Sequence, residues 1–192
     1  MRPTPFFFVA VACWWALALA WLPGYFVRLR RRDAPTPYRA WQAVATPLLF
    51  LSFALLFVGR PPALRIGVTP PSAALGIIGD ALAIAGVAFA IWARVTLGRN
   101  WSGLVMMVRE GQGLVQRGPY AIVRHPIYAG ILAAVVGTAL TRGTLASWLG
   151  VAAGFVGVLI RVEIEDRLMA AEFGEAHADY RKRTRKLVPF LW

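Results

Sequence analysis

The chain has 192 residues, 58% of them hydrophobic, and a formal net charge of +12. Soluble domains are about 45–50% apolar, so this composition predicts an integral membrane protein. The basic residues gather at the ends of apolar segments, which is the pattern of membrane topology, and no soluble basic face of the kind that binds nucleic acid is visible. The single cysteine, Cys13, excludes an intramolecular disulfide.

Three apolar segments in the first half of the chain are predicted to span the membrane. They cover residues 5–27, 40–58 and 72–92, each long enough for the roughly 20 apolar residues that a bilayer helix needs. Pro23-Gly24 is expected to kink or end the first helix. The third segment is rich in glycine and alanine, which let another helix backbone approach closely. The first segment lacks a clean cleavage site, so we interpret it as a retained span.

Two shorter apolar segments follow, at residues 126–140 and 145–160. Each offers about 15 residues, or roughly 22 Å of helix, which is short for a full span. We interpret them as a tight hairpin or a re-entrant pair. The tail, residues 161–192, is helical in pattern to about Tyr180, with an interruption at Gly174. The predicted fold is therefore all-α, with about five transmembrane helices, the last two a short hairpin, and a cytoplasmic C-terminal helix.

The distribution of lysine and arginine predicts the orientation in the membrane. Most of the 21 basic residues lie in three places: residues 28–39 after the first span, residues 94–124 between the third and fourth apolar segments, and the tail from residue 161. The remainder are Arg2, Arg60, Arg65 and Arg142. By the positive-inside rule the N-terminus is outside and the C-terminus is cytoplasmic, so residue 125 and the tail share the cytoplasmic side.

Residues 118–130, Gly-Pro-Tyr-Ala-Ile-Val-Arg-His-Pro-Ile-Tyr-Ala-Gly, are the most chemically dense run in the sequence. Pro126 suits the first position of the next helix, which puts His125 at or beside the N-cap. The free N–H groups and positive dipole of a helix start attract anions. The run therefore predicts a receptor for a carboxylate or phosphate at the membrane boundary. The alternative is a polar cap that faces lipid headgroups.

A second polar group, residues 161–166, lies where the last span leaves the membrane on the same side. Arg161 and Glu165 are one helical turn apart and share a helix face. An exposed ion pair contributes only about 0–1 kcal/mol, and one beside apolar surroundings costs more to desolvate. Function is therefore the more natural reason for this pair, and the alternative is a snorkelling arginine with a surface ion pair.

Several common site types have no counterpart in the sequence. Gly111-Gln112-Gly113 lacks the spacing of a dinucleotide-binding loop, and no P-loop or Gly-x-Ser-x-Gly elbow occurs. The only histidines are His125 and His177, and there is no cluster of the metal-ligand kind. A Rossmann cofactor site, an NTPase and a zinc hydrolase are therefore disfavoured, and no metal is expected.

Four motifs in order resemble the isoprenylcysteine carboxyl methyltransferase family, over about residues 94–190. They are Leu-Gly-Arg-Asn-Trp-Ser (97–102), the run at 118–130, the set Arg161, Glu165, Asp166 and Leu168, and Phe-Gly-x-x-x-x-x-Tyr (173–180). Asp166 stands where a second glutamate is usual in that family, and His177 where a tyrosine is common.

The resemblance implies a membrane-embedded methyltransferase that uses S-adenosyl-L-methionine without a Rossmann domain. The chain would be one domain, with a two-helix part (1–71) and a catalytic core (72–192). Arg161 and Glu165 are implied as catalytic, and Arg161 would also hold the methyl acceptor. The implied cofactor-binding residues are Gln112, Gly113, Leu114, Val115, Tyr120, His125, Pro126, Tyr128 and Glu165. The cofactor's carboxylate suits the helix start and His125, its ammonium suits Glu165, and the tyrosines offer aromatic faces.

The expected reaction is direct methyl transfer, at the cytoplasmic side, to the carboxylate of a lipophilic acceptor such as a prenylcysteine-like compound. The acceptor would enter sideways from the bilayer. A carboxylate is already ionised at neutral pH, so positioning and exclusion of water suffice.

Three alternatives remain open. A phospholipid amine or small thiol would need a base, which Glu163 or Asp166 could supply. A membrane reductase would use a nicotinamide cofactor instead. A non-enzymatic scaffold would use its basic tail, residues 181–186, to bind a partner or anionic membrane lipids. The sequence indicates no oligomeric state.

Overall fold

The structure is a computed structural model that describes residues 5–28, 39–58, 62–101 and 113–188. Within these ranges the chain is helical, and four helices are long and apolar enough to cross a membrane, while a fifth apolar helix is shorter. The helices are α1 (Pro5–Arg28), α2 (Arg39–Phe57), α3 (Ala73–Leu97), α4 (Pro126–Arg142) and α5 (Leu145–Arg183), with short 3-10 helices η1 (Pro62–Arg65), η2 (Gly98–Asn100) and η3 (Gly118–Ala121). The predicted all-α, multi-pass membrane fold is confirmed.

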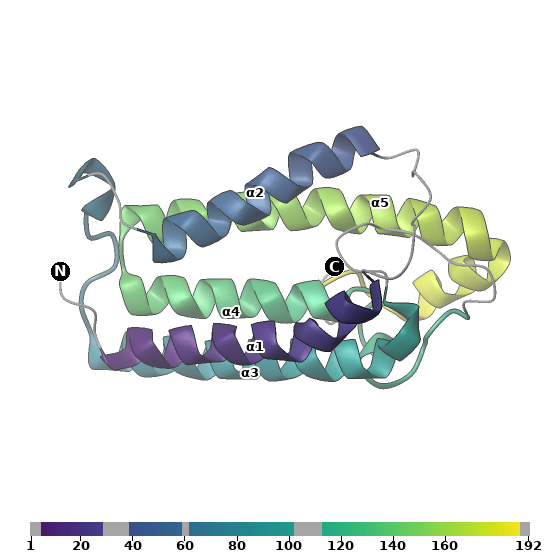
Figure 1. The fold of residues 1–192 in the computed structure, drawn as a ribbon, viewed down its shortest axis with the longest axis horizontal. Helices are drawn as coiled ribbons and strands as arrows, with labels where there is room; N and C mark the ends of the chain where they lie inside the picture. The colour runs from purple at the N-terminus through teal and green to yellow at the C-terminus, as the bar shows by residue number, and fades with distance from the viewer. Residues whose placement is uncertain (1–4, 29–38, 59–61, 102–112, 189–192) are drawn as a thin grey trace.

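The helices lie roughly side by side in two layers, as Figure 1 shows. One layer pairs α2 with α5, and the other holds α4 with α1 and α3. At one end of the bundle lie η1 and the turn from α4 to α5. At the other end α5 extends beyond its neighbours and bends back, close to η3 and the start of α4. This second end holds the polar residues that the sequence singles out.

Glycines bring α3 and α4 into close contact, as the small residues of the third segment predict. A Cβ on Gly86 would lie 2.5 Å from the carbonyl oxygen of Gly130, and one on Gly79 would lie 2.7 Å from that of Gly137. Real side chains do not tolerate such distances, so the two backbones touch directly. This contact fixes the start of α4, and with it His125, against α3.

The helix α1 continues through Pro23-Gly24 to Arg28, one residue beyond the predicted span, so this pair does not end the helix. The observed end of α3 differs more, because the helix continues to Leu97 rather than stopping near residue 92. The predicted tight turn between the last two spans is present. Gly143 has a left-handed backbone with φ of 63°, and Thr144 caps α5 by accepting a hydrogen bond from the backbone N–H of Ser147.

The helix α5 unites the last predicted span with the tail helix and turns at Gly174, where φ is 49°. Beyond α5, residues 184–188 form a segment that we call the strap. The strap lies beside the residues before α4: the N–H of Arg124 donates to the Arg185 carbonyl (2.8 Å) and that of His125 to the Lys186 carbonyl (3.0 Å). Leu187 is buried against α5. The C-terminal segment is thus part of the polar end of the bundle.

Candidate active site

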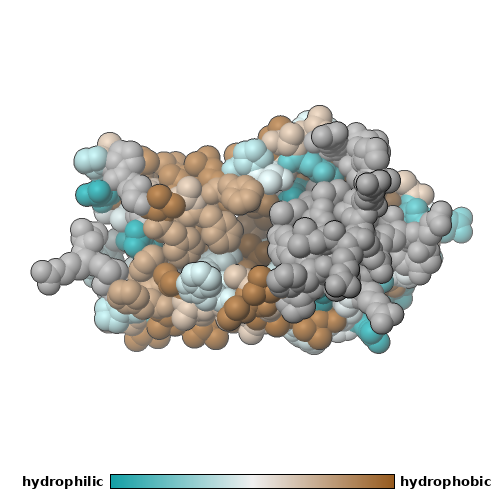
Figure 2. Space-filling model, in the orientation of Figure 1, coloured by the Kyte–Doolittle hydropathy of each residue, from teal (hydrophilic) through white to brown (hydrophobic). Residues whose placement is uncertain are grey.

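A cavity of about 380 Å³ opens between the helices at this end, and all five helices contribute to its wall. Its lining is divided by chemistry. Aromatic side chains such as Trp14, Phe50 and Phe53 line one part, and polar side chains of α4 and α5 line the other. Figure 2 shows apolar side chains over the middle of the visible face, with the surface hollowed among them. The cavity therefore joins a polar chamber to an apolar one.

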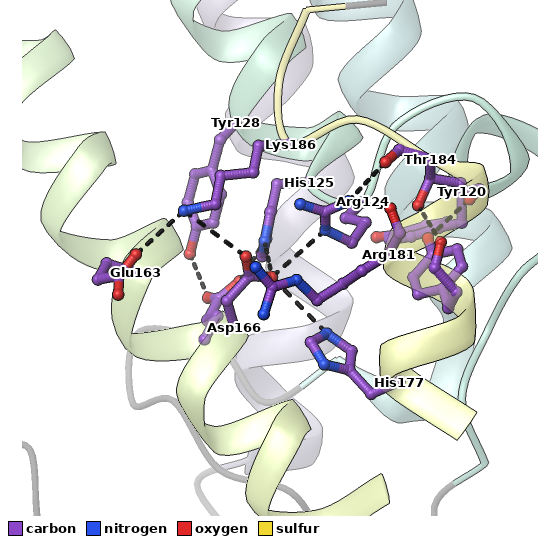
Figure 3. A network of polar contacts seen from close by, with 12 residues as sticks. Tyr120, Arg124, His125, Tyr128, Glu163, Asp166, His177, Arg181, Thr184 and Lys186 are labelled. Atoms are coloured by element: carbon purple, nitrogen blue, oxygen red, sulfur yellow. Dashed lines mark hydrogen bonds and ion pairs between the residues drawn. The ribbon is translucent and has the colours of Figure 1, made fainter. Parts of the chain in front are cut away.

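His125 stands at the centre of the polar wall, at the N-cap of α4 as predicted, with Pro126 as the first helical residue. Its ring lies between two consecutive carboxylates of α5. Nδ1 is 3.3 Å from Oε2 of Glu165, and Nε2 is 3.0 Å from Oδ1 of Asp166. Figure 3 shows the ring directed at this part of α5. The imidazole thus joins the start of α4 to α5.

The electrostatic environment favours the charged form of His125. Burial alone lowers the pKa of this group, but hydrogen bonds with Asp166 and Glu165 outweigh burial and raise it above the usual 6.5. In the resulting imidazolium both ring nitrogens donate to carboxylates. His125 therefore acts on Glu165 by holding and orienting it.

Tyr128 lies one turn into α4 and links Glu165 to Arg161. Its hydroxyl donates to Oε1 of Glu165 at 2.5 Å and accepts a hydrogen bond from Nε of Arg161 at 3.1 Å. Arg161 is 2% exposed. The predicted meeting of His125 with Arg161 and Glu165 is thus present in the structure, as one continuous polar chain along the cavity wall.

Asp166 contacts several other polar residues, whereas the sequence singled it out only as a member of the third motif and as a possible base. Besides His125, its carboxylate lies 3.6 Å from Nε of Arg124, 3.7 Å from Nε2 of His177 and 3.7 Å from Nζ of Lys186. His177 is buried and follows the turn at Gly174, so it reaches Asp166 because the helix bends back. The only sequence signals for these contacts were the glycine in the tail and the unusual residues at 166 and 177.

Tyr120 closes the chamber from the side of η3. Its backbone carbonyl accepts a hydrogen bond of 2.6 Å from the hydroxyl of Tyr180, in the last part of α5. Burial and the nearby carboxylate of Glu165 raise the pKa of the Tyr120 phenol, so it stays protonated. An aromatic face with a neutral hydroxyl is therefore present at the cavity wall.

Most of the residues predicted for the site surround this one cavity. Pro126 is buried at the start of α4 and does not line it, and Gln112 lies outside the described residues. Those that line it are Gly113, Leu114, Val115, Tyr120, His125, Tyr128, Arg161 and Glu165. Among the described residues, no three histidine, cysteine or acidic side chains are grouped to hold a metal ion.

The sequence model of the family "Phospholipid methyltransferase" matches residues 75–176, which is more than half of the chain. The chain therefore belongs to this family of membrane methyltransferases, to which the isoprenylcysteine methyltransferases are related. The resemblance stated from the motifs is thereby confirmed.

Relatives with several different descriptions are similar to this chain. The cobalt-zinc-cadmium resistance protein CzcN of Cupriavidus metallidurans is 32% identical over 152 residues, 79% of this chain and 62% of that protein. Methanethiol S-methyltransferase 2 of Bradyrhizobium diazoefficiens is 42% identical over 74 residues, 38% of this chain and 27% of that one. Protein-S-isoprenylcysteine O-methyltransferase of Tribolium castaneum is 29% identical over 126 residues, 61% of this chain and 42% of that one.

A solved structure shares the fold. It is that of the eukaryotic intramembrane Ras methyltransferase ICMT (isoprenylcysteine carboxyl methyltransferase), with a TM-score of 0.56 and 24% identity, over 83% of this chain and 55% of that one. The chain thus spans at most 62% of the length of the relatives and the structure described here.

Proposed function

We propose that this protein transfers a methyl group from S-adenosyl-L-methionine to the carboxylate of a lipophilic acceptor, such as a prenylcysteine-like compound. Family membership supports the reaction class. The observation that carries the proposal is the convergence of Arg161, Tyr128, Glu165 and His125 on one cavity whose other part is apolar. A charged cofactor and a lipid-like acceptor require these two environments side by side.

The polar chamber offers charged and aromatic groups that suit this cofactor. Glu165 would pair with the cofactor's ammonium, and its carboxylate is held from both sides by His125 and Tyr128. Tyr120 and Tyr128 offer aromatic faces to a sulfonium or an adenine. Gly113, Leu114 and Val115 would complete the pocket, as would Gln112. When bound, S-adenosyl-L-methionine supplies a methyl group activated by the positive charge on its sulfur.

Arg161 is the group proposed to hold the acceptor. A guanidinium binds a carboxylate through paired, charge-assisted hydrogen bonds, and these are stronger where water is excluded. The side chain of Arg161 is almost fully buried, lines the cavity and is oriented by Tyr128. A carboxylate near its usual pKa of about 4 is ionised at neutral pH, so the transfer needs positioning rather than a base.

The apolar chamber supports a lipophilic acceptor that enters from the bilayer. The indole N–H of Trp14 donates to Oγ1 of Thr138 at 2.9 Å, which leaves the apolar faces of the ring for the cavity. Phe50 of α2 lines the cavity and is 66% exposed. A lining side chain that is so exposed supports an opening of the cavity toward the lipid at this place.

The positive-inside rule supports the orientation that we propose, with the N-terminus outside and the active site on the cytoplasmic side. The polar end of the bundle carries the basic strap and the charged part of α5. Cofactor from the cytoplasm and acceptor from the membrane would then reach the cavity by different routes.

A thiol acceptor is the second candidate, because one stretch of the chain is 42% identical to a methanethiol S-methyltransferase. A thiol or amine must lose a proton. Of the two bases proposed from the sequence, Glu163 is not part of the cavity lining and pairs with Arg167 and Lys186. Asp166 lines the cavity, so the proton would leave through Asp166.

The test uses the purified full chain in lipid nanodiscs with S-adenosylmethionine labelled in its methyl group. A prenylcysteine analogue, a small thiol and an amine-bearing phospholipid are offered in parallel, and the labelled product is identified. We expect label on the carboxylate, at a rate that is flat above neutral pH when the cofactor is saturating. Label on the thiol, with a rate that rises toward the thiol pKa of about 8.5, would support the second candidate.

Binding measurements in the same preparation decide between the reaction classes. We expect calorimetry to detect S-adenosylmethionine and its demethylated product. Binding of reduced nicotinamide instead would point to a reductase, and binding of none of these molecules would point to a scaffold.

A further inference from the structure

A second, open groove of about 760 Å³ lies outside the cavity, at the same end of the bundle. Seven residues line it, five of them basic and none acidic: Arg124, Ala178, Arg181, Lys182, Thr184, Arg185 and Lys186. We propose that this groove binds the phosphate group of an anionic phospholipid in the surrounding leaflet. The proposal does not depend on the identity of the methyl acceptor.

The fold builds this concentration of charge from three segments. Arg124 precedes α4, and Arg181 and Lys182 lie in the last turns of α5. The other two basic residues, Arg185 and Lys186, belong to the strap. The turn at Gly174 and the pairing of the strap with residues 123–125 bring them together. Figure 3 shows Arg124, Arg181 and Thr184 around the same place. The charges therefore line a concave surface instead of being spread along one solvated helix.

Two of the five cations are available for a ligand. Arg124 donates to the Thr184 carbonyl at 2.6 Å, Lys182 pairs with Asp179 at 2.8 Å, and Lys186 pairs with Glu163 at 3.0 Å. Arg181 and Arg185 are exposed, and neither forms an ion pair with a carboxylate of the part of the chain that the structure describes. A guanidinium binds phosphate through two parallel hydrogen bonds, so this pair suits a phosphate ligand.

The expected position of the groove relative to the membrane favours a lipid over a free phosphate. Arg124 lies two residues before α4, a short apolar helix of the bundle, and we therefore place the groove at the membrane boundary. Two large apolar residues that are each two positions from a lining residue are exposed, Ile122 by 43% and Val188 by 45%. Basic residues flanked by exposed apolar ones are typical of surfaces at the level of lipid headgroups.

The test is binding of a fluorescent phosphatidylglycerol to the purified full chain in neutral detergent, with phosphatidylcholine for comparison. The variant R181Q/R185Q removes the two available charges. The matched control R65Q/R183Q removes two charges outside the groove: Arg65 lies in η1 at the other end, and Arg183 contacts Gln116. We expect the groove variant to weaken binding of phosphatidylglycerol by about thirtyfold, since each basic residue near a membrane surface contributes about fivefold. The control should change it by less than about threefold.

Equal loss in both variants, or equal affinity for the two lipids, would overturn the proposal, because net charge or apolar contact would then explain binding. Inorganic phosphate that displaces the lipid better than chloride of equal ionic strength would show a soluble anion to be the ligand instead. Thermal unfolding checks that both variants fold. If the groove variant does not, the wild type decides: its affinity for phosphatidylglycerol must fall with salt, and a salt-independent affinity would reject the site.

Discussion

His125 connects the start of α4 to α5. Its backbone is held by the strap, its ring by Glu165 and Asp166, and it caps α4. One residue thus orients the proposed cofactor ligand and also ties the polar end of the bundle together. Its protonation should therefore be visible both in stability and in binding.

Stability should depend on pH through His125. Because its folded-state pKa is raised above 6.5, the contribution of the imidazolium to stability is complete below the unfolded pKa and is lost as pH rises through the folded one. We expect the thermal midpoint of the ligand-free protein to fall as pH increases from about 6 upward, and His125→Gln to lack this step. Differential scanning fluorimetry across pH measures both. If the thermal midpoints of the wild type and of His125→Gln changed with pH in parallel, the positive charge assigned to His125 would be contradicted.

Substitutions of Arg161 and of Glu165 should have different effects on turnover and on cofactor affinity. Arg161→Ala is expected to lower turnover by at least about a hundredfold, because it removes the proposed acceptor contact. Cofactor affinity should be largely spared, because the hydrogen bonds of His125 and Tyr128 with Glu165 remain. Glu165→Gln should weaken cofactor binding by about tenfold or more, since a charge-assisted hydrogen bond is lost. Turnover and calorimetric affinity are measured for both. Arg167→Ala, at an exposed surface pair, is the control.

At the scale of elements, the contact between α3 and α4 places His125. Gly86→Ala would put a Cβ 2.5 Å from the Gly130 carbonyl and force the helices apart, at a cost of about 1–3 kcal/mol. We expect a lower thermal midpoint and weaker cofactor binding together. Gly67→Ala is the control, because no atom lies within 4 Å of its added Cβ and its φ is not in the left-handed range. An unchanged midpoint for Gly86→Ala would mean that the helices are not in direct contact.

The turn at Gly174 determines where the last part of α5 goes. The space around it is open, but its backbone, with φ 49° and ψ −120°, is one that residues with a Cβ rarely adopt. Gly174→Ala should therefore cost about 1–3 kcal/mol through strain alone. It should also displace His177 and Tyr180 from the chamber, so cofactor affinity should fall. Gly67→Ala again serves as the neutral comparison, and full cofactor affinity in Gly174→Ala would contradict this role.

For the whole molecule, the proposed opening beside Phe50 would make the bilayer the solvent of a lipid-like acceptor. Turnover per enzyme with a lipid-like acceptor should follow the mole fraction of the acceptor in the nanodisc. It should stay constant when discs of fixed composition are diluted while the cofactor is kept at a saturating concentration. A water-soluble thiol should instead follow bulk concentration. Rates at two lipid ratios and two disc concentrations separate these cases, and dependence of the lipid acceptor on bulk concentration would contradict entry from the membrane.

The parts of this molecule that could be predicted from sequence rest on local signals. Hydrophobic length located the spans, and the count of basic residues put His125 and Arg161 on one side, so their meeting followed. Pairings between distant segments carry no such signal. The strap lies beside residues 123–125 through backbone hydrogen bonds that any sequence can make. His177 reaches Asp166 only because α5 turns back at Gly174. Polar residues such as Arg94 masked the continuation of α3 to Leu97.

The pairing of the strap with the start of α4 has a consequence for biosynthesis. A ribosome releases His125 well before residues 184–188, so the chamber stays unfinished while α5 is being inserted. The chamber would thus be completed only once residues 184–188 have emerged and paired with residues 124 and 125. A product that stops within α5 would lack these backbone hydrogen bonds and leave the chamber incomplete.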